Sequence, residues 1–228
     1  MLKKTLLAAV VLGLSTTAVQ ANEVSGYVTG SVGQAKAEKP KSFKQEQNDY
    51  YKAFGGSTSS DRTDTAYKIA VGLQANPYVA LELQYVDLGE STYKGRDSDS
   101  YSGGSWSENE KFNLKTSGFG ANLVGTLPID DFTLFAKAGY HYLKTKGYDK
   151  YSYTETVSGV TGNYGFKDSG TIRKWAPSFG VGASYNFTKE LAVVAEYERY
   201  QGVADKKIEG VKFKHDIDLA SVGLRYNF

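Results

Sequence analysis

The sequence is poor in several residue types that define common classes of protein. Among 228 residues it has no cysteine, one methionine, four prolines and two histidines. Without cysteine the chain can form neither a disulfide framework nor a cysteine-linked lipid anchor. Neither histidine has metal-ligand spacing to the other. We therefore predict no metal and no cofactor.

An excess of charge of one sign is also missing. Met1–Lys4 carries two lysines, Thr5–Leu14 is apolar, and Val19–Ala21 offers small residues for cleavage. This pattern predicts a secretory signal peptide over residues 1–21 and a mature domain over residues 22–228. Removing two of the 27 Lys+Arg leaves 25, which balance 25 Asp+Glu. A neutral mature chain gives no indication of nucleic-acid binding.

Long hydrophobic runs are missing too, since none after the signal peptide reaches the ~18 residues of a membrane helix. The chain has instead 25 Gly, 18 Tyr and 11 Phe, which favours β-sheet. Alternating apolar residues mark eight predicted strands. They are 24–33, 65–74, 78–86, 111–126, 132–142, 175–187, 191–197 and 218–228. In the fourth, Phe112 and Leu114 fall out of phase with Phe119, which predicts either a bulge or an extended rim there.

The connections between these segments alternate between long and short. The long polar ones are about 35–64, 88–110, 144–174 and 202–216, and the short ones lie near Pro77, at 127–131 and at 186–190. Long structureless loops are uncommon in compact soluble domains, but outer-membrane barrels have short periplasmic turns and longer extracellular loops. The predicted fold class is all-β. It is a closed, antiparallel, eight-stranded transmembrane β-barrel with four long extracellular loops and three short periplasmic turns.

The two faces of the predicted strands indicate which side meets lipid. The face opposite the apolar stripe is rich in glycine, alanine and serine, yet it holds charges that are poorly suited to an apolar core. We therefore expect the apolar stripe to face lipid and the small and charged residues to line a narrow lumen. The predicted lumen network is Lys68, Glu82, Gln84, Asn122, Lys137, Glu196 and Arg225.

The alternation continues to the end of the chain, where Val222, Leu224, Tyr226 and Phe228 share one face. In lipid every backbone N–H and C=O needs a partner, so we expect the last strand to pair with the first. Tyr226 and Phe228 would then lie in the aromatic belt at the periplasmic interface.

Four segments of the sequence together carry a family resemblance. They are "QANPYVALELQYVDLGE", "GTLPIDDFTLFAKAGY", "APSFGVGASYNFTKELAVVAEYE" and "LASVGLRYNF". In this order they resemble the eight-stranded transmembrane domain of the outer-membrane protein A family, although the loops do not match. The resemblance extends to the barrel domain and to no peptidoglycan-binding domain, so it implies no cell-wall tether. Leu224, Tyr226 and Phe228 are similar to the C-terminal signal by which such chains are handed to the barrel-assembly machinery.

Members of that family also carry interior ion pairs proposed to gate a narrow pore. Glu82 matches one acidic gate position, but Asn122, Ser184 and Val194 stand at three others. The resemblance therefore does not imply the family's gate in its full form. Other charged residues of the predicted lumen could form a substitute network, because buried charges persist when they are paired. The candidates are Lys68, Lys137, Glu196 and Arg225.

These observations predict an integral protein of a Gram-negative outer membrane with a structural or narrow porin-like role and no enzymatic activity. The lumen charges would form either an ion path or a salt-bridge plug that rigidifies the barrel. His215 and Asp216, at the start of the last predicted strand, are a catalytic candidate. Strand geometry argues against it, because adjacent residues of a strand point to opposite faces.

The alternative function is that of a surface adhesin or receptor. The long loops are rich in Tyr, Ser, Gly and Asn, the residues of adaptable binding surfaces. The competing interpretation is that they extend the strands and cap the barrel. Expected partners are outer-membrane lipid and lipopolysaccharide, the barrel-assembly machinery during biogenesis and, in the alternative, an extracellular ligand bound by the loops.

Overall fold

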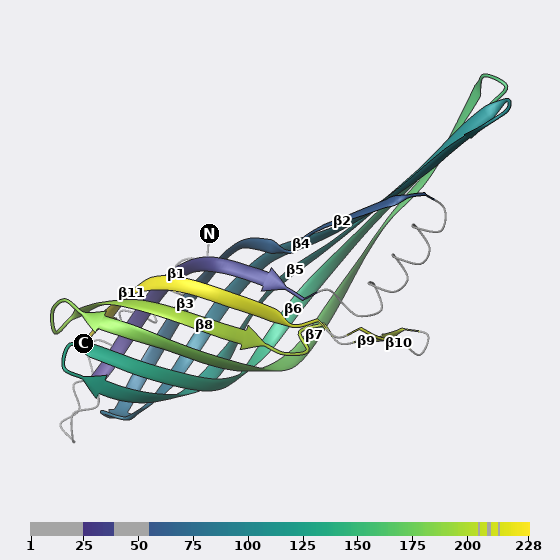
Figure 1. Cartoon of the computed structure of the whole chain (residues 1–228). Helices are drawn as coiled ribbons and strands as arrows, with labels where there is room; N and C mark the ends of the chain where they lie inside the picture. The colour runs from purple at the N-terminus through teal and green to yellow at the C-terminus, as the bar shows by residue number, and fades with distance from the viewer. Residues whose placement is uncertain (1–24, 39–54, 205, 209–210, 214) are drawn as a thin grey trace, which may run out of the picture.

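The computed structural model describes residues 25–38, 55–204, 206–208, 211–213 and 215–228, and the predicted signal peptide lies outside them. No helix long and apolar enough to cross a membrane occurs among the described residues. Eight long strands form the body of the molecule (Figure 1). They are β1 (Ser25–Ala37), β3 (Thr63–Asn76), β4 (Val79–Tyr101), β5 (Gly104–Ile129), β6 (Phe132–Val157), β7 (Val160–Asn186), β8 (Leu191–Tyr200) and β11 (Ile217–Asn227). Three short strands accompany them: β2 (Ser57–Asp61), β9 (Lys206–Ile208) and β10 (Val211–Phe213).

The eight long strands close into a ring. Each pairs antiparallel with its neighbours in the order β4-β3-β1-β11-β8-β7-β6-β5, and β5 pairs back to β4. The last strand pairs with the first over eleven residue pairs, from Tyr27↔Asn227 to Ala37↔Ile217. Gly26 and Phe228 exchange two backbone hydrogen bonds of 2.8 Å at the end of this seam. The predicted closed eight-stranded barrel is thereby confirmed, and the chain end is part of its wall.

The side chains alternate across this wall as predicted. Within the barrel the outward face is mainly apolar on every long strand, and its large exposed side chains include Leu81, Leu83, Leu123, Phe179 and Leu224. Inward-pointing residues are small or polar at most positions, which lets eight strands close around a filled interior. An outward apolar belt of this kind suits contact with lipid and not with water.

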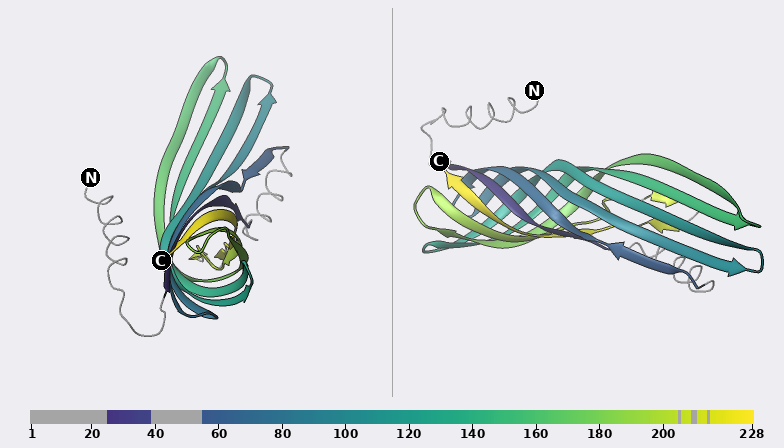
Figure 2. Two further views of the ribbon diagram at one scale, coloured as in Figure 1. Left: turned by 90° about the vertical axis from the view of Figure 1, so that its left-hand side faces the viewer. Right: turned by 90° about the horizontal axis from the view of Figure 1, so that it is seen from above.

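The three predicted short turns are present at one end of the barrel, the end that also holds the C-terminus (Figure 1) and Gly26, which pairs with Phe228. At the other end the structure differs from expectation. Residues 88–101 and 104–110 continue β4 and β5, and residues 144–157 and 160–174 continue β6 and β7. Two of the four expected long loops are therefore β-ribbons that project beyond the barrel (Figure 2).

The ribbons form because main-chain hydrogen bonds need no apolar side chains, and because each ribbon ends in a tight two-residue turn. Gly103 (φ 94°) serves the first turn, and Ser158 (φ 50°) with Gly159 (φ 80°) serves the second. In the second turn, positive φ at both central residues gives the type I′ geometry that suits the twist of a hairpin. The polar composition of these segments hid the strand pairing from sequence analysis.

Of the two alternatives expected for the change of phase in β5, the structure shows the extended rim, because β5 runs on beyond the barrel, and the bulge lies in its partner strand β4. The register of β4 against β5 shifts between Asp87 and Glu90, where Gly89 adopts a φ of 71°. The extra residue reverses the parity of β4, so Ser91 and Tyr93 continue the inward face that Val86 and Leu88 occupy below. β5 runs on regularly, which places Phe112 and Leu114 on the inward face. Their change of phase marks the place where β5 leaves the lipid belt.

Candidate functional site

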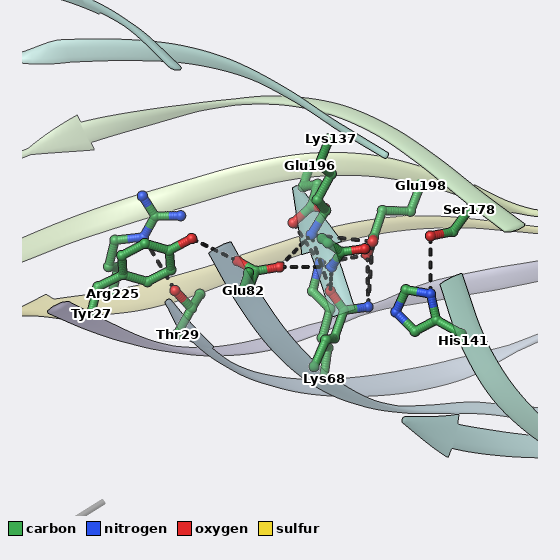
Figure 3. Close-up of polar contacts among 12 residues, drawn as sticks. Tyr27, Thr29, Lys68, Glu82, Lys137, His141, Ser178, Glu196, Glu198 and Arg225 are labelled. Atoms are coloured by element: carbon green, nitrogen blue, oxygen red, sulfur yellow. Dashed lines mark hydrogen bonds and ion pairs between the residues drawn. The ribbon is translucent and has the colours of Figure 1, made fainter. Parts of the chain in front are cut away.

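Five charged side chains meet at mid-height in the barrel lumen (Figure 3). Lys68 from β3 lies 2.5 Å from Glu196 and 2.7 Å from Glu198, both on β8. Lys137 from β6 lies 3.0 Å from Glu82 on β4 and 3.2 Å from Glu198, and it also contacts Glu196. None of the five side chains is more than 6% exposed. We call these five residues the lumen cluster.

Neutral donors and acceptors complete the lumen cluster. Gln84 donates to Glu198 at 3.3 Å and to the Tyr200 hydroxyl at 2.7 Å, and Tyr200 in turn donates to Glu198 at 3.1 Å. Asn122 donates to Glu82 and to the Gln84 side-chain oxygen, each at 3.0 Å. Buried charges require this degree of hydrogen bonding, because the desolvation cost otherwise exceeds the attraction between them.

The backbone leaves room for the cluster through glycine. A Cβ atom added at Gly180 on β7 would lie 2.9 Å from Glu198 Cγ and 3.1 Å from Lys137 Cγ. The two charged stems thus lie against the bare backbone of β7. A side chain at this position would push both of them away from their partners.

Apolar layers lie on either side of the lumen cluster. Toward the ribbons, Leu143, Tyr200, Val203 and Leu219 belong to one fully buried group. Toward the turns, Phe135 and Val194 pack in another with Tyr27, Ala80 and Val124. The interior is therefore layered, apolar, charged and apolar, which is less uniformly polar than the sequence predicted. The stacking of these layers leaves the bore filled.

Six of the seven predicted lumen residues meet in or beside the cluster, and Arg225 lies apart. Its guanidinium stands 4.1 Å above the Tyr27 ring and donates to Thr29 at 3.2 Å. The Tyr27 hydroxyl donates to Glu82 at 3.0 Å, so the Tyr27 side chain lies between Arg225 and the cluster (Figure 3). Near Arg225 a cavity of about 230 Å³ opens at the mouth on the turn side.

Sequence reasoning missed three members of the site. Glu198 and Tyr200 continue the inward parity of Ala192, Val194 and Glu196, but the predicted strand ended at residue 197. Extending that alternation by three residues would have found both. Tyr27 lies on the inward face of β1. Polar residues interrupt the apolar alternation of this strand, so the sequence did not indicate the role of Tyr27.

The positions that resemble the family's gate are occupied differently here. Asn122 supplies hydrogen bonds to the cluster where the family has a cation. Val194 lies in the apolar layer with Phe135, and Ser184 is buried near the turn-side mouth. The cations of this lumen are instead Lys68 on β3 and Lys137 on β6, and Glu82 keeps the acidic position that the resemblance implies.

The structure also brings a serine to one of the histidines. Ser178 Oγ lies 3.0 Å from His141 Nδ1, and the imidazole packs edge-on against Tyr200 at 5.2 Å. His141 is fully buried and Ser178 is 2% exposed. Among the described residues there is no group of three or more potential metal ligands.

His215 and Asp216, the weak catalytic candidate, lie buried at the outer rim of the barrel. Asp216 accepts a hydrogen bond of 2.7 Å from the Gly202 amide, and Arg199 lies 3.1 Å from its carboxylate. Arg199 also forms an ion pair with Glu38, which links β8 to the residue that follows β1 at this rim. Burial lowers the pKa of His215 below its usual value. Both residues anchor the segment between β8 and β11.

Comparison with known proteins agrees with this architecture. Residues 5–228 match the model of the outer membrane protein beta-barrel domain family. An uncharacterized protein of Coxiella burnetii is 28% identical over 91% of this chain and 88% of its own length. Outer membrane protein A of Shigella flexneri is 28% identical over 69% of this chain, but the match spans only 38% of that longer relative.

Two solved structures that align with most of this chain have little sequence identity to it. Neisserial surface protein A is 14% identical with a TM-score of 0.49, covering 90% of this chain and 100% of that one. The outer membrane protein OprG of Pseudomonas aeruginosa is 11% identical with a TM-score of 0.49, covering 90% and 96%.

Proposed function

Because the chain belongs to the outer membrane protein beta-barrel domain family and resides in the outer membrane, we propose that it is a non-enzymatic barrel whose lumen is closed by a salt-bridge plug. The observation that carries this proposal is the lumen cluster itself. Lys68 and Lys137 are held by three glutamates from across the bore, and all five are buried. The plug stiffens the barrel and permits at most narrow diffusion of small solutes.

The experiment is single-channel recording of the refolded mature barrel in a planar bilayer. The wild-type protein is compared with a Glu82→Ala, Lys137→Ala double variant, and folding of each is verified by its heat-modifiable mobility on a gel. We expect small, infrequent openings in the wild type and larger, longer ones in the variant. The matched control is Lys146→Ala, an exposed residue of β6 in the ribbon beyond the barrel. A large steady conductance in the wild type would contradict a plug.

The proposal that the protein is not an enzyme is supported by the burial of the serine–histidine pair found among the described residues. Ser178 and His141 hydrogen bond inside the lumen, where both side chains are buried away from solvent. We expect no hydrolysis of ester, phospholipid or peptide substrates by the refolded protein. Activity that disappears in Ser178→Ala would overturn this expectation.

For assembly, the C-terminal residues are proposed to be recognised by the barrel-assembly machinery. Leu224, Tyr226 and Phe228 all point outward and are at least 40% exposed; the first two lie on the seam strand β11, and Phe228 directly follows it. Tyr226→Ser and Phe228→Ser together should reduce insertion in cells while leaving refolding in detergent intact. Equal loss in both settings would indicate a structural role for these residues.

A second candidate function, surface recognition, is favoured by the two ribbons that project from the barrel (Figure 1). Together they present four paired strands with exposed aromatic and charged side chains. Removing residues 95–110 and 149–168 should abolish such recognition without affecting conductance or membrane insertion. Loss of insertion would show that the ribbons serve the barrel itself.

A further inference from the structure

The two ribbons form one sheet whose faces carry opposite charge. We define the projecting sheet as residues 90–101 of β4, 104–117 of β5, 144–157 of β6 and 160–173 of β7, which pair side by side. Residues directly opposite in such pairs share a face. The face that continues the lumen side holds seven acidic residues and no cation: Asp97, Asp99, Glu108, Glu110, Asp149, Glu155 and Asp168.

The other face, here called the outer face, is basic. It carries nine cations: Lys94, Arg96, Lys111, Lys115, Lys144, Lys146, Lys150, Lys167 and Arg173. Glu90 is its one acidic residue within the projecting sheet, and Glu90 accepts a hydrogen bond of 2.7 Å from Asn113. The separation of charge between the faces follows from strand parity alone.

The centre of the outer face is a row of four lysines that crosses all four strands. Lys94 is opposite Lys111, Lys111 is opposite Lys150, and Lys150 is opposite Lys167. All four are exposed, and none forms an ion pair within the described part of the chain. Like charges placed directly opposite destabilise a sheet. A local rule broken in this way is expected where a function requires it.

A hollow beside this row is suited to an anion. A cavity of about 240 Å³ is lined by Lys94, Arg96, Lys111 and Lys150, with the polar side chains of Asn109 and Ser152. Gly95 and one carboxylate, Glu110, complete its lining. Ammonium and guanidinium groups beside amide and hydroxyl donors are the partners that phosphate oxygens take.

The position of the outer face identifies where the anion comes from. On the barrel below, the same face is the lipid-facing belt, which ends in the aromatic contacts of Tyr142 with Phe119 (5.8 Å) and Trp175 (5.4 Å). Lys144, paired with Arg173, comes two residues after Tyr142, and Lys150 comes eight residues after it. At about 3.3 Å per residue, the cations begin ~7 Å beyond the aromatic rings and reach the lysine row ~26 Å along the strand.

We propose that the outer face binds the phosphorylated headgroup and inner sugars of lipopolysaccharide in the surrounding membrane. An occupant of this surface must lay acyl chains on the apolar belt and carry a series of anionic groups directly above it. Lipopolysaccharide carries acyl chains at one end and phosphate and acidic sugar groups directly above them, in one molecule. Arg173, Lys144 and Lys146 would meet the groups nearest the membrane, and the lysine row would meet the anionic groups above them.

The test is binding of rough-chemotype lipopolysaccharide micelles to the refolded, detergent-solubilised barrel, followed by thermophoresis of the labelled protein. The variant replaces Lys94, Lys111, Lys150 and Lys167 by glutamine. We expect it to bind about ten- to a hundredfold more weakly at physiological salt, since each exposed cation contributes modestly beside an anionic lipid surface. Gel mobility before and after heating verifies that each protein is folded.

Two matched controls isolate the role of charge at this face. The fourfold lysine-to-arginine variant should retain the affinity of the wild type. Asn or Gln replacing Asp97, Asp99, Glu108 and Asp149 on the opposite face should not weaken binding. Lipopolysaccharide stripped of its phosphates should bind the wild type as weakly as the glutamine variant binds the intact lipid.

Two results would overturn the proposal. One is a glutamine variant that binds lipopolysaccharide within twofold of the wild type. The other is a wild type that binds a soluble sulfated polysaccharide tightly while its affinity for lipopolysaccharide is unchanged by phosphate removal. The second result would show that the basic face serves an anion from solution and not one in the membrane.

Discussion

The barrel lumen and the projecting sheet contain the same charged residue types in opposite arrangements. In the lumen, two lysines from different strands each contact at least two glutamates, and all are buried. In the projecting sheet, lysine lies beside lysine on one exposed face and acidic residues gather on the other. Burial demands pairing because an isolated charge is costly away from water. Exposure removes that demand, since solvent screens like charges.

Breaking the lumen cluster should have the largest effect on stability. Lys137→Met deletes contacts to three glutamates: it leaves Glu196 and Glu198 paired with Lys68, and it leaves Glu82 with no ion pair among the described residues. Removing one partner of a buried ion pair costs about 3–5 kcal/mol. We expect a loss of this size in the free energy of unfolding by urea in lipid vesicles. The control is Lys146→Met on the outer face, and equal losses in the two variants would refute the comparison.

A charge placed on the lipid-facing surface should cost somewhat less. Leu83 points outward and is 63% exposed, and Leu83→Arg should lose roughly 2–4 kcal/mol near the bilayer midplane. Ser107→Arg on the outer face of the projecting sheet should change stability by no more than about 0.5 kcal/mol. The free energy of unfolding of both variants would be measured in lipid bilayers of the same composition. A stable Leu83→Arg protein would show that this face does not meet lipid.

Two glycines of β7 allow a direct comparison of the regions within one strand. Gly180→Ala should cost about 1–3 kcal/mol, because the added Cβ would press on Glu198 and Lys137. Gly170 in the projecting sheet has open space at the same atom, so Gly170→Ala should be near neutral. Denaturant midpoints of the two variants measure the difference. A cost at Gly170 as large as that at Gly180 would contradict the tight packing inferred for the lumen.

The junction between the two regions should respond to pH through His215. Burial lowers the pKa of His215 in the folded protein, so the unfolded chain takes up a proton first as the pH falls. The free energy of unfolding should therefore decrease from about pH 6.5 downward, until the pH reaches the lowered pKa of the folded state. Measurements at pH 7.5 and 5 compare the wild type with His215→Gln. An equal decrease in both proteins would assign the effect to other groups.

The smallest effect should come from the lysine row, and its sign should be reversed. Lys111→Gln removes one of four aligned positive charges and should stabilise the sheet by about 0.2–1 kcal/mol. Hydrogen exchange of the amides of β5 at low salt would measure this change. Destabilisation by Lys111→Gln would mean that the row is already neutralised within the protein.

The alternation of residues along each strand was enough to predict the barrel, its outward apolar belt and most lumen residues. Period-two patterning decides which face a side chain occupies, and lipid allows only one orientation for the apolar face. The ribbons could not be predicted in the same way. The backbones of the ribbons pair along their full length. Both faces of the ribbons are polar or mixed, however, so they lack the apolar alternation from which a strand is predicted.

The sequence by itself determined inside and outside, whereas only the tertiary structure decided which inward residues meet. Lys68 and Glu196 are separated by 128 positions, and their contact depends on ring closure and on the stagger of every intervening strand. Parity carries no information about height, which is why Arg225 was grouped with charges that it does not touch. The lysine row depends on register in the same way. Three hairpin pairings had to align four lysines before they became one surface.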